Sequence, residues 1–444
     1  MARFQIDDGG CSRAGRLLDR LRSSCLLLSR QILSRQLLAA AASVACLATT
    51  NIAVAAGPET SAVKRGRYLV TAGNCISCHT TEGGQPFAGG LAFETPFGKM
   101  YSTNITPDAK TGIGKWSQQD FNRALREGVR PNGEHLYPAF PYTTYTKTSD
   151  EDAAAIFAYL KTLPPVNSAA KPNELSFPFN QRWALGIWKA IYFTEGRFTP
   201  DKAQSAEWNR GAYLVEGLGH CSACHSPRNF LGAESTSMAM TGGEYTNKVH
   251  GGEVRPWSAP NLTSASTGLG SWPVNEVAAY LKTGRNSFLE TFGPMNEVIM
   301  NSTQHLSDAD VRAMATYLKS LPANEGKLAA SANTDVLRDG ETLYNVHCGT
   351  CHQPTGLGGP EEDSGARLAG GSLVVQASNP ASLINVILYG PQGPNPPLPK
   401  RWKHMEPLGD KLDDEEVAAL ASYLRSAWDN KGGEVTAEQV AKQR

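Results

Sequence analysis

The pattern C-x-x-C-H occurs three times in the chain and constrains the fold more than any other feature. The copies read CISCH at 75–79, CSACH at 221–225 and CGTCH at 348–352. Two cysteines three positions apart lie about one helical turn apart, so both thiols can reach the two vinyl groups of one porphyrin. The histidine that follows can bind the iron from below. The sequence therefore predicts three covalently bound haem c groups, one for each motif.

The cysteines of the motifs are expected to attach haem, and the histidines are expected to bind its iron. Cysteine pairs of this kind also occur in zinc sites and in redox-active disulfides. A four-cysteine zinc site normally draws on pairs closer in sequence than these, and a thioredoxin-like redox pair would sit in a β-α-β pattern, which is not visible. The cysteines expected to attach haem are Cys75, Cys78, Cys221, Cys224, Cys348 and Cys351, and the histidines expected to bind iron as proximal ligands are His79, His225 and His352.

The first 56 residues have the pattern of an export signal. Seven arginines and three aspartates in residues 1–36 precede the apolar stretch LLAAAASVACLATTNIAVAA, and Ala53-Val54-Ala55 fits the A-x-A cleavage pattern. We predict a signal peptide over 1–56 and an exported mature protein. The alternative is an uncleaved anchor, but the stretch is Ala-rich and only moderately apolar. Cys46 follows a weak lipobox, and no later run is long and apolar enough to cross a bilayer.

The chain repeats one module three times. Each C-x-x-C-H motif follows a short amphipathic helix, and each copy closes with a capped helix that carries Tyr-Leu-Lys or Tyr-Leu-Arg, at 149–164, 307–322 and 413–428. Strand signals are few, so the predicted fold class is all-α, with three tandem domains in one chain. We expect the first module at 57–168, the second at 201–325 and the third at 326–430, with a polar C-terminal tail at 431–444.

The segments between motif and closing helix distinguish the third module from the others. STNITPDAKTGIGKW at 102–116 parallels APNLTSASTGLGSW at 259–272, and each leads into a helix. The third module has instead a Gly-rich segment at 358–371 and a Pro-rich loop at 390–400, which we expect to lie over the haem. An aromatic-rich interdomain linker occupies 169–200. We interpret it as packing between domains, with a membrane or partner surface as the alternative.

A cytochrome c domain usually binds iron with histidine below and methionine above, from a loop before the closing helix. Met295 in FGPMNEV is the expected distal ligand of the second module, because the preceding proline stiffens the loop, although Met300 competes. Met405 in KHMEPLG is the expected ligand of the third. In the first module Phe140 of HLYPAFPY occupies this position. Phenylalanine has no lone pair for iron, so the first distal ligand is unknown.

Three outcomes are open at the first iron. His135 could make a bis-histidine haem, Met100 could bind if the loop folds differently, or the iron could stay five-coordinate behind the ring of Phe140. We favour the last, with His135 as a surface or propionate-side histidine, because the loop otherwise keeps a regular spacing. A haem without methionine should have a lower potential than the other two, since methionine ligation raises it.

The three motifs, together with TPFGKMYSTNITPD, YPAFPY, CHSPRN, GPMNEV and YLKSLP, resemble the three-haem cytochrome c subunit of membrane-bound bacterial dehydrogenases. This family includes the alcohol, gluconate and sorbitol dehydrogenase cytochrome subunits, and the resemblance covers residues from about 60 to 430. It implies three class I-type cytochrome c domains. It also implies a separate catalytic dehydrogenase subunit, a quinoprotein, flavoprotein or molybdenum enzyme, whose electrons pass to ubiquinone at the cytoplasmic membrane surface. The family pattern at the first haem is YPAMPY, from which Phe140 departs.

The function that follows is electron transfer without chemistry on a substrate. There is no dinucleotide glycine fingerprint, no G-x-S-x-G and no H-E-x-x-H, and zero net charge without a basic stripe gives nucleic-acid binding little support. We expect a periplasmic subunit that passes electrons from a dehydrogenase oxidising an alcohol, sugar or aldehyde to ubiquinone or the respiratory chain. The alternatives are a peroxidase-like haem enzyme that uses an open first haem and a cytochrome subunit of a respiratory oxidase.

Overall fold

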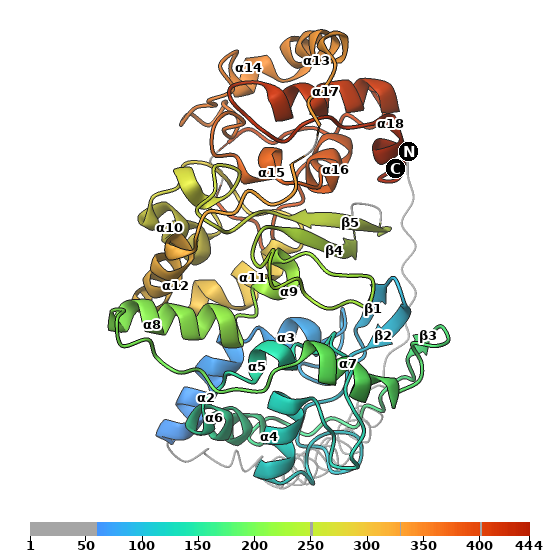
Figure 1. The fold of residues 1–444 in the computed structure, drawn as a ribbon, viewed down its shortest axis with the longest axis vertical. Coiled ribbons are helices and arrows are strands. Elements are labelled where there is room, and N and C mark those ends of the chain that lie inside the picture. The colour runs from blue at the N-terminus through green and yellow to red at the C-terminus, as the bar shows by residue number, and fades with distance from the viewer. Residues whose placement is uncertain (1–59, 249–251, 329, 400–401) are drawn as a thin grey trace, which may run out of the picture. The chain divides into compact units, whose positions relative to one another are not determined.

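Three pairs of crossing helices form the framework of the molecule (Figure 1). The computed structural model describes residues 60–248, 252–328, 330–399 and 402–444, and the unit from Thr60 to Arg444 is compact. The expected signal peptide at 1–56 lies outside the described residues. In each module the helix before the C-x-x-C-H motif packs on the closing helix. The pairs are α2 (Ser61–Ala72) with α6 (Asp150–Leu160), α8 (Ala206–Tyr213) with α12 (Asp308–Ser320), and α13 (Thr334–His347) with α17 (Asp414–Ser426).

Further helices complete each module. The first module adds α3 (Cys75–Cys78), α4 (Gln118–Glu127) and α5 (Tyr142–Tyr145). The second adds the π-helical turn η1 (Leu214–Leu218), α9 (Ser222–His225), the 3-10 turn η2 (Leu269–Ser271), α10 (Val274–Thr283), α11 (Met295–Asn301) and the 3-10 turn η3 (Thr303–His305). The third adds α14 (Gly349–His352), α15 (Leu373–Gln376), α16 (Ala381–Tyr389) and α18 (Ala437–Ala441).

A glycine lets the two long helices of each module approach closely. A Cβ atom at this position would overlap a backbone carbonyl of the closing helix, so alanine does not fit without a backbone shift. The tyrosine of the Tyr-Leu-Lys/Arg pattern lies beside the same contact and packs there. The built Cβ atoms lie 1.9 Å from Ala155 O for Gly66, 1.9 Å from Ala313 O for Gly211 and 2.2 Å from Ala419 O for Gly340.

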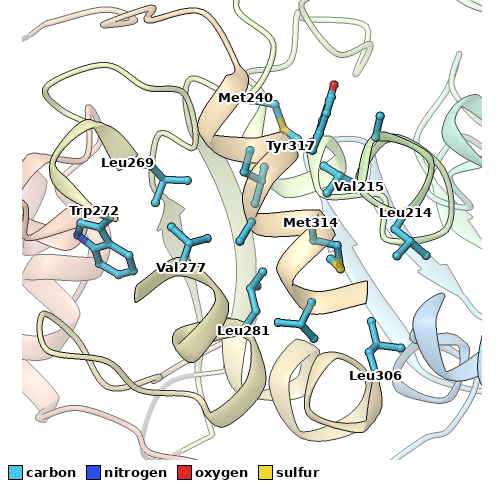
Figure 2. Packing of buried hydrophobic residues seen from close by; sticks show 14 of the residues in the cluster. Leu214, Val215, Met240, Leu269, Trp272, Val277, Leu281, Leu306, Met314 and Tyr317 are labelled. Atoms are coloured by element: carbon cyan, nitrogen blue, oxygen red, sulfur yellow. The ribbon is translucent and has the colours of Figure 1, made fainter. Parts of the chain in front are cut away.

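Each module has its own cluster of buried apolar side chains. Figure 2 shows the cluster of the second module, in which Trp272, Val277 and Met314 pack between the helices. The first two clusters also exchange a residue. Leu218 of the second module packs in the first core, and Ala72 of the first module packs in the second core. These two residues hold the same position, three before the first cysteine of their motifs. The first two modules are therefore joined by apolar packing as well as by polar contacts.

The prediction of an all-α fold is wrong in part, because the described residues include five short strands in two sheets. Strands β1 (Ala92–Thr95) and β2 (Gly98–Tyr101) make a hairpin, to which β3 (Glu174–Leu175) of the interdomain segment adds an antiparallel edge. Strands β4 (Gly243–Lys248) and β5 (Val254–Ala259) make a second hairpin. β-Branched and aromatic residues at Tyr245, Thr246 and Trp257 favour this pairing. Helices still provide most of the regular structure.

The expected linker and tail are both structured. In the interdomain segment, helix α7 (Ala184–Tyr192) buries Leu185, and the indole N–H of Trp188 donates to Leu231 O at 3.0 Å in the second module. In residues 431–444, α18 packs on α17, and Val435 and Val440 belong to the third core. No helix in the described part of the chain combines the length and apolar character that a bilayer span needs.

A reciprocal pair of polar contacts joins the first and second modules. Asp310 of α12 accepts hydrogen bonds from Arg210 of its own module, at 2.7 Å, and from the hydroxyl of Tyr68 in the first module, at 2.5 Å. Asp152 of α6 accepts hydrogen bonds from Arg65 of its own module, at 2.5 Å, and from Tyr213 in the second, at 2.6 Å. Each module thus inserts a tyrosine hydroxyl into the carboxylate site of the other. We call these two contacts the tyrosine–aspartate exchange.

The third module meets the second through its Pro-rich loop and the start of α16. The backbone N–H of Gly293 and the amide of Asn296 both donate to Gln392 O, at 2.9 and 2.7 Å. Ser382 and Ser258 exchange hydrogen bonds between α16 and β5. The Pro-rich loop of the third module therefore supports the loop that carries Met295 in the second.

Candidate metal centres

Each C-x-x-C-H motif forms one helical turn that ends at its histidine. The backbone N–H of the histidine donates to the carbonyl of the first cysteine, at 3.0 Å in the first and second motifs and 2.9 Å in the third. This i→i+4 bond places the two cysteines and the histidine on one short helix. The three motifs therefore have the same local geometry, in α3, α9 and α14.

The proximal histidines share one hydrogen-bond arrangement. The Nδ1 atom of each lies at hydrogen-bond distance from a backbone carbonyl oxygen: His79 from Thr103 O at 2.6 Å, His225 from Pro260 O at 2.7 Å and His352 from Ala366 O at 2.6 Å. A carbonyl only accepts, so Nδ1 carries the proton and Nε2 keeps its lone pair. This is the tautomer that a metal ligand needs, and the second-shell carbonyl fixes the orientation of the ring.

Burial gives the three histidines a further property of iron ligands. It lowers the pKa of His79, His225 and His352, and outweighs the opposing effect of the carbonyl hydrogen bonds. The imidazoles are therefore neutral near pH 7. Because a metal binds the neutral imidazole, no proton has to leave before iron can bind.

None of the six motif cysteines forms a disulfide bond with another residue. Burial raises the pKa of the first cysteine of every motif to about 12, that of Cys78 to about 12 and that of Cys224 to about 11. These groups are neutral thiols near neutral pH rather than reactive thiolates. Within the described residues, no group of three or more His, Cys, Asp or Glu side chains is arranged to hold a metal ion. Free paired thiols beside a histidine with an available Nε2 fit covalent attachment of a c-type haem.

The repeated middle segments supply the carbonyls that hold the first two histidines. Thr103 and Pro260 occupy the same position in the two copies, each before an asparagine. Asn104 ties its segment to the chain beyond the closing helix, because its amide donates to Val166 O at 2.7 Å. Asn261 does the same with Asn324 O at 2.8 Å. The repeat is visible in the sequence, but its role in holding the proximal histidine is not. The shared Asn-x-Thr pattern was the available signal for this role.

The Gly-rich segment replaces this support in the third module. Ala366 provides the carbonyl for His352, and a Cβ atom at the neighbouring Gly365 would lie 2.7 Å from the imidazole ring. The residue at 365 therefore has to be small for the histidine to take this position. The third module lacks the middle repeat and uses the Gly-rich segment to hold its histidine in the same geometry.

The expected distal ligands of the second and third modules lie on loops held by neighbouring segments. Met295 opens α11 and packs beside the second core, and Gly293 before it has a positive φ of 59° and lies against the ring of Trp257. The competing Met300 has its sulfur 3.8 Å from the amide nitrogen of Gln304. Met405 is half-buried in a loop before α17. Ligation by Met295 and Met405 remains a prediction.

Phe140 lies where the sequence places the distal ligand of the first module. Its side chain packs on the first core together with Cys75 and Ile76, and its ring centroid lies 5.3 Å from that of Tyr145. Burial raises the pKa of Tyr145 well above its usual value, and the cysteines of the first motif add to the effect. Phe140 is thus part of the apolar cluster that includes the haem-attachment segment of its module.

The first and second motifs lie near each other. The amide of Asn301 in α11 donates to the Ser77 hydroxyl between the two cysteines of the first motif, at 2.8 Å. The hydroxyl of Ser302 donates to Ala72 O at 3.1 Å. The helix that begins with Met295 therefore ends against the attachment segment of the first module.

Two family models match the chain. The model described as Cytochrome c matches residues 63–164, and the model described as Cytochrome C oxidase, cbb3-type, subunit III matches residues 335–424. The matched regions hold the first and third C-x-x-C-H motifs. Covalent haem c is therefore expected at both.

Three relatives are similar over most of the chain. The gluconate 2-dehydrogenase cytochrome c subunit of Pantoea cypripedii is 38% identical over 396 residues, which are 86% of this chain and 89% of the relative. The cytochrome c subunit of alcohol dehydrogenase (quinone) from Gluconobacter oxydans is 38% identical over 398 residues, 86% of this chain and 82% of the relative. A nicotinate dehydrogenase subunit of Pseudomonas putida is 43% identical over 372 residues, but these are 82% of this chain and only 30% of that longer protein.

Proposed function

Because the chain belongs to the family of cytochrome c subunits of gluconate and alcohol dehydrogenases, we propose that it is the three-haem electron-transfer subunit of a membrane-bound dehydrogenase. The observation that carries this proposal is the repeated geometry of the proximal histidines. All three hold Nδ1 on a backbone carbonyl and keep Nε2 for iron. When bound, each haem supplies reversible one-electron chemistry. The six motif cysteines would hold the three groups covalently.

The contacts between modules support a path through the second module. Its α11 reaches the first motif through Asn301, and its Met295 loop is held by the third module through Gln392. These hydrogen bonds would hold the spacing between the centres fixed. We propose that the second centre is intermediate between the other two.

The partner in this proposal is a catalytic dehydrogenase subunit, a quinoprotein, flavoprotein or molybdenum enzyme that oxidises an alcohol, sugar or aldehyde. Ubiquinone in the cytoplasmic membrane is the acceptor, and the subunit works on the periplasmic face. A respiratory-oxidase subunit is less well supported, since the oxidase model matches the third module alone. A peroxidase also fits less well, because Phe140 has no group that accepts a proton and the raised pKa of the neighbouring Tyr145 keeps its hydroxyl protonated.

Helix α7 offers a surface for the membrane in this proposal. Trp183, Ile187 and Ile191 are spaced four residues apart and are 69%, 57% and 65% exposed, so they form one apolar stripe. Such a stripe with an aromatic residue suits the interface of a bilayer. Replacing all three by serine should weaken flotation with liposomes of bacterial phospholipid. Val346→Ser, at an exposed valine of the third module, is the control and should have no effect.

Purification of the tagged subunit from its native host tests the proposed function. We expect a catalytic dehydrogenase to co-purify and the complex to reduce a soluble ubiquinone analogue. Replacing the six motif cysteines by alanine should abolish this reduction while leaving dye-linked oxidation by the catalytic subunit. Co-purification with a copper–haem oxidase, or isolation alone with peroxide turnover, would contradict the proposal.

A further inference from the structure

Phe140 is held firmly in the position where the first module should present a distal ligand. Its backbone N–H donates to Tyr137 O at 3.0 Å, and its carbonyl accepts from Tyr142 N at 2.8 Å. The following helix α5 then places Tyr145 against the Phe140 ring. The loop is therefore ordered around a side chain that fills apolar space and cannot bind iron.

His135 is turned toward the interdomain helix α7. Its Nδ1 lies 3.4 Å from the ammonium of Lys189, and a Cβ atom at Gly186 would lie 3.4 Å from its Nε2. Its backbone is fixed by a bridge to Val129 and by a hydrogen bond from Arg182 to its carbonyl. Both ring nitrogens thus face α7, and ligation of iron would require the bridge and the packing on this helix to break.

Met100 lies on strand β2 and pairs with Phe93 of β1. It is buried, with 8% of its surface exposed. Three residues later the chain reaches Thr103, whose carbonyl holds Nδ1 of His79, so this segment supports the proximal side of the site. A thioether on that side cannot reach the distal face without moving the support of the proximal histidine.

His220 of the second module is a further histidine near the first centre. Its ring meets Tyr145 edge-on, with centroids 5.7 Å apart, and its Nε2 lies 3.4 Å from Gly73 O. Nε2 therefore donates to Gly73 O and is used at the module junction, and only Nδ1 keeps a lone pair. This histidine holds the junction between the modules.

We propose that the first metal centre is open on its distal side and is a binding site for small neutral ligands of ferrous haem, such as carbon monoxide and nitric oxide. In this proposal Met295 and Met405 close the second and third centres. This inference rests on the proposed haem of the first module. The apolar ring of Phe140 offers no hydrogen bond to an anion, so a small neutral molecule is the class of ligand that we expect at this site.

Carbon monoxide titration of the dithionite-reduced full-length protein is the test. We expect one carbon monoxide bound per three haems, and one high-spin haem in the ligand-free spectrum. Phe140→Met should give three low-spin haems, reduce carbon monoxide binding at least tenfold and raise the potential of the first haem. Phe140→Leu, which is apolar but has no ligand atom, should keep the binding. Met295→Phe is the matched change in the second module and should raise the stoichiometry to two.

Three low-spin haems without carbon monoxide binding in the wild type would overturn the proposal, and binding that appears only in His135→Ala would identify that histidine as the ligand. Carbon monoxide binding unchanged by Phe140→Met would also overturn it, because the open haem would then belong to another module. Counting the haems from alkaline pyridine spectra distinguishes failure of the open-site proposal from failure of the proposed function. Two haems per chain would contradict the three-haem proposal, whereas three closed haems contradict only the open site.

Discussion

The first and second modules share a framework but differ in the loop that faces the iron. In both modules a glycine-containing helix packs on the closing helix. In both, the proximal histidine binds the backbone carbonyl of the residue before an asparagine. Both also take part in the tyrosine–aspartate exchange. The second module then places Pro294 and Met295 at the start of α11, whereas the first places Phe140 before α5. The proximal half of such a site is therefore set by the framework, while the distal half depends on a single loop residue.

The largest effect should come from the helix crossings. A Cβ atom at Gly66 or Gly211 would meet a backbone carbonyl at 1.9 Å in both modules. Overpacking typically costs up to about 3 kcal/mol and occasionally more, and a clash with a backbone atom belongs at the upper end of this range. We expect Gly66→Ala and Gly211→Ala each to lower the urea midpoint of the holoprotein by a similar amount. An effect on one variant alone would show that the two crossings are not equivalent.

The next effect concerns the tyrosine–aspartate exchange. Tyr68→Phe and Tyr213→Phe each remove one hydrogen bond to a carboxylate, worth about 1.5–3 kcal/mol. Both variants should destabilise the protein, and Thr342→Val, at the corresponding position of α13 in the third module, should not. The corresponding measurement is again the urea midpoint. If neither tyrosine variant differs from wild type, the exchange does not contribute to stability.

The same exchange should make stability depend on pH. Burial alone would raise the pKa of Asp310, but hydrogen bonds from Arg210 and Tyr68 outweigh it, so its pKa is lowered. Its contribution is complete above the usual aspartate pKa of about 4 and is lost as the pH falls through the lowered value. Between pH 6 and strongly acidic pH, thermal stability should therefore fall less steeply in Asp310→Asn than in wild type. Equal slopes would contradict this assignment.

The smallest effect should come from the helix caps. Thr60 caps α2 and Ser205 caps α8, each through a side-chain oxygen that accepts from the backbone of the first turn. Replacement of such a cap by alanine costs about 1 kcal/mol. Thr60→Ala and Ser205→Ala should give equal small shifts in thermal unfolding. A shift only in the second module would indicate that the N-terminus of α2 is stabilised in another way.

The closing helices were predicted well because the signals that start a helix lie in neighbouring residues. The three closing helices begin after the expected capping residues, Ser149, Ser307 and Asp413. In the third module Glu416 completes the capping box, whereas the matching Asp152 and Asp310 bind an arginine and the tyrosine of the neighbouring module. The sequence shows a carboxylate at all three positions. Only the tertiary arrangement determines which partner it takes.

The features that the sequence did not reveal depend on contacts between distant segments. Strand β5 contains Pro256, which interrupts the strand pattern but pairs with Thr246 and accepts a hydrogen bond from Asn385 through its carbonyl. The carbonyl acceptors of the proximal histidines belong to the backbone, so no side-chain motif marks them. Phe140 could be identified from the sequence, but the orientations of His135 and Met100 required the structure.

Peptide mapping of the exported protein by mass spectrometry is the sharpest test of the three-haem assignment, because it counts haem separately in each module. We predict the mature chain plus three haems, with equal and full occupancy of the peptides that contain Cys75 and Cys78, Cys221 and Cys224, and Cys348 and Cys351. The departure at Phe140 changes the distal side alone and should leave attachment in the first module complete. Free thiols at any motif, or a mass with only two haems, would contradict the assignment.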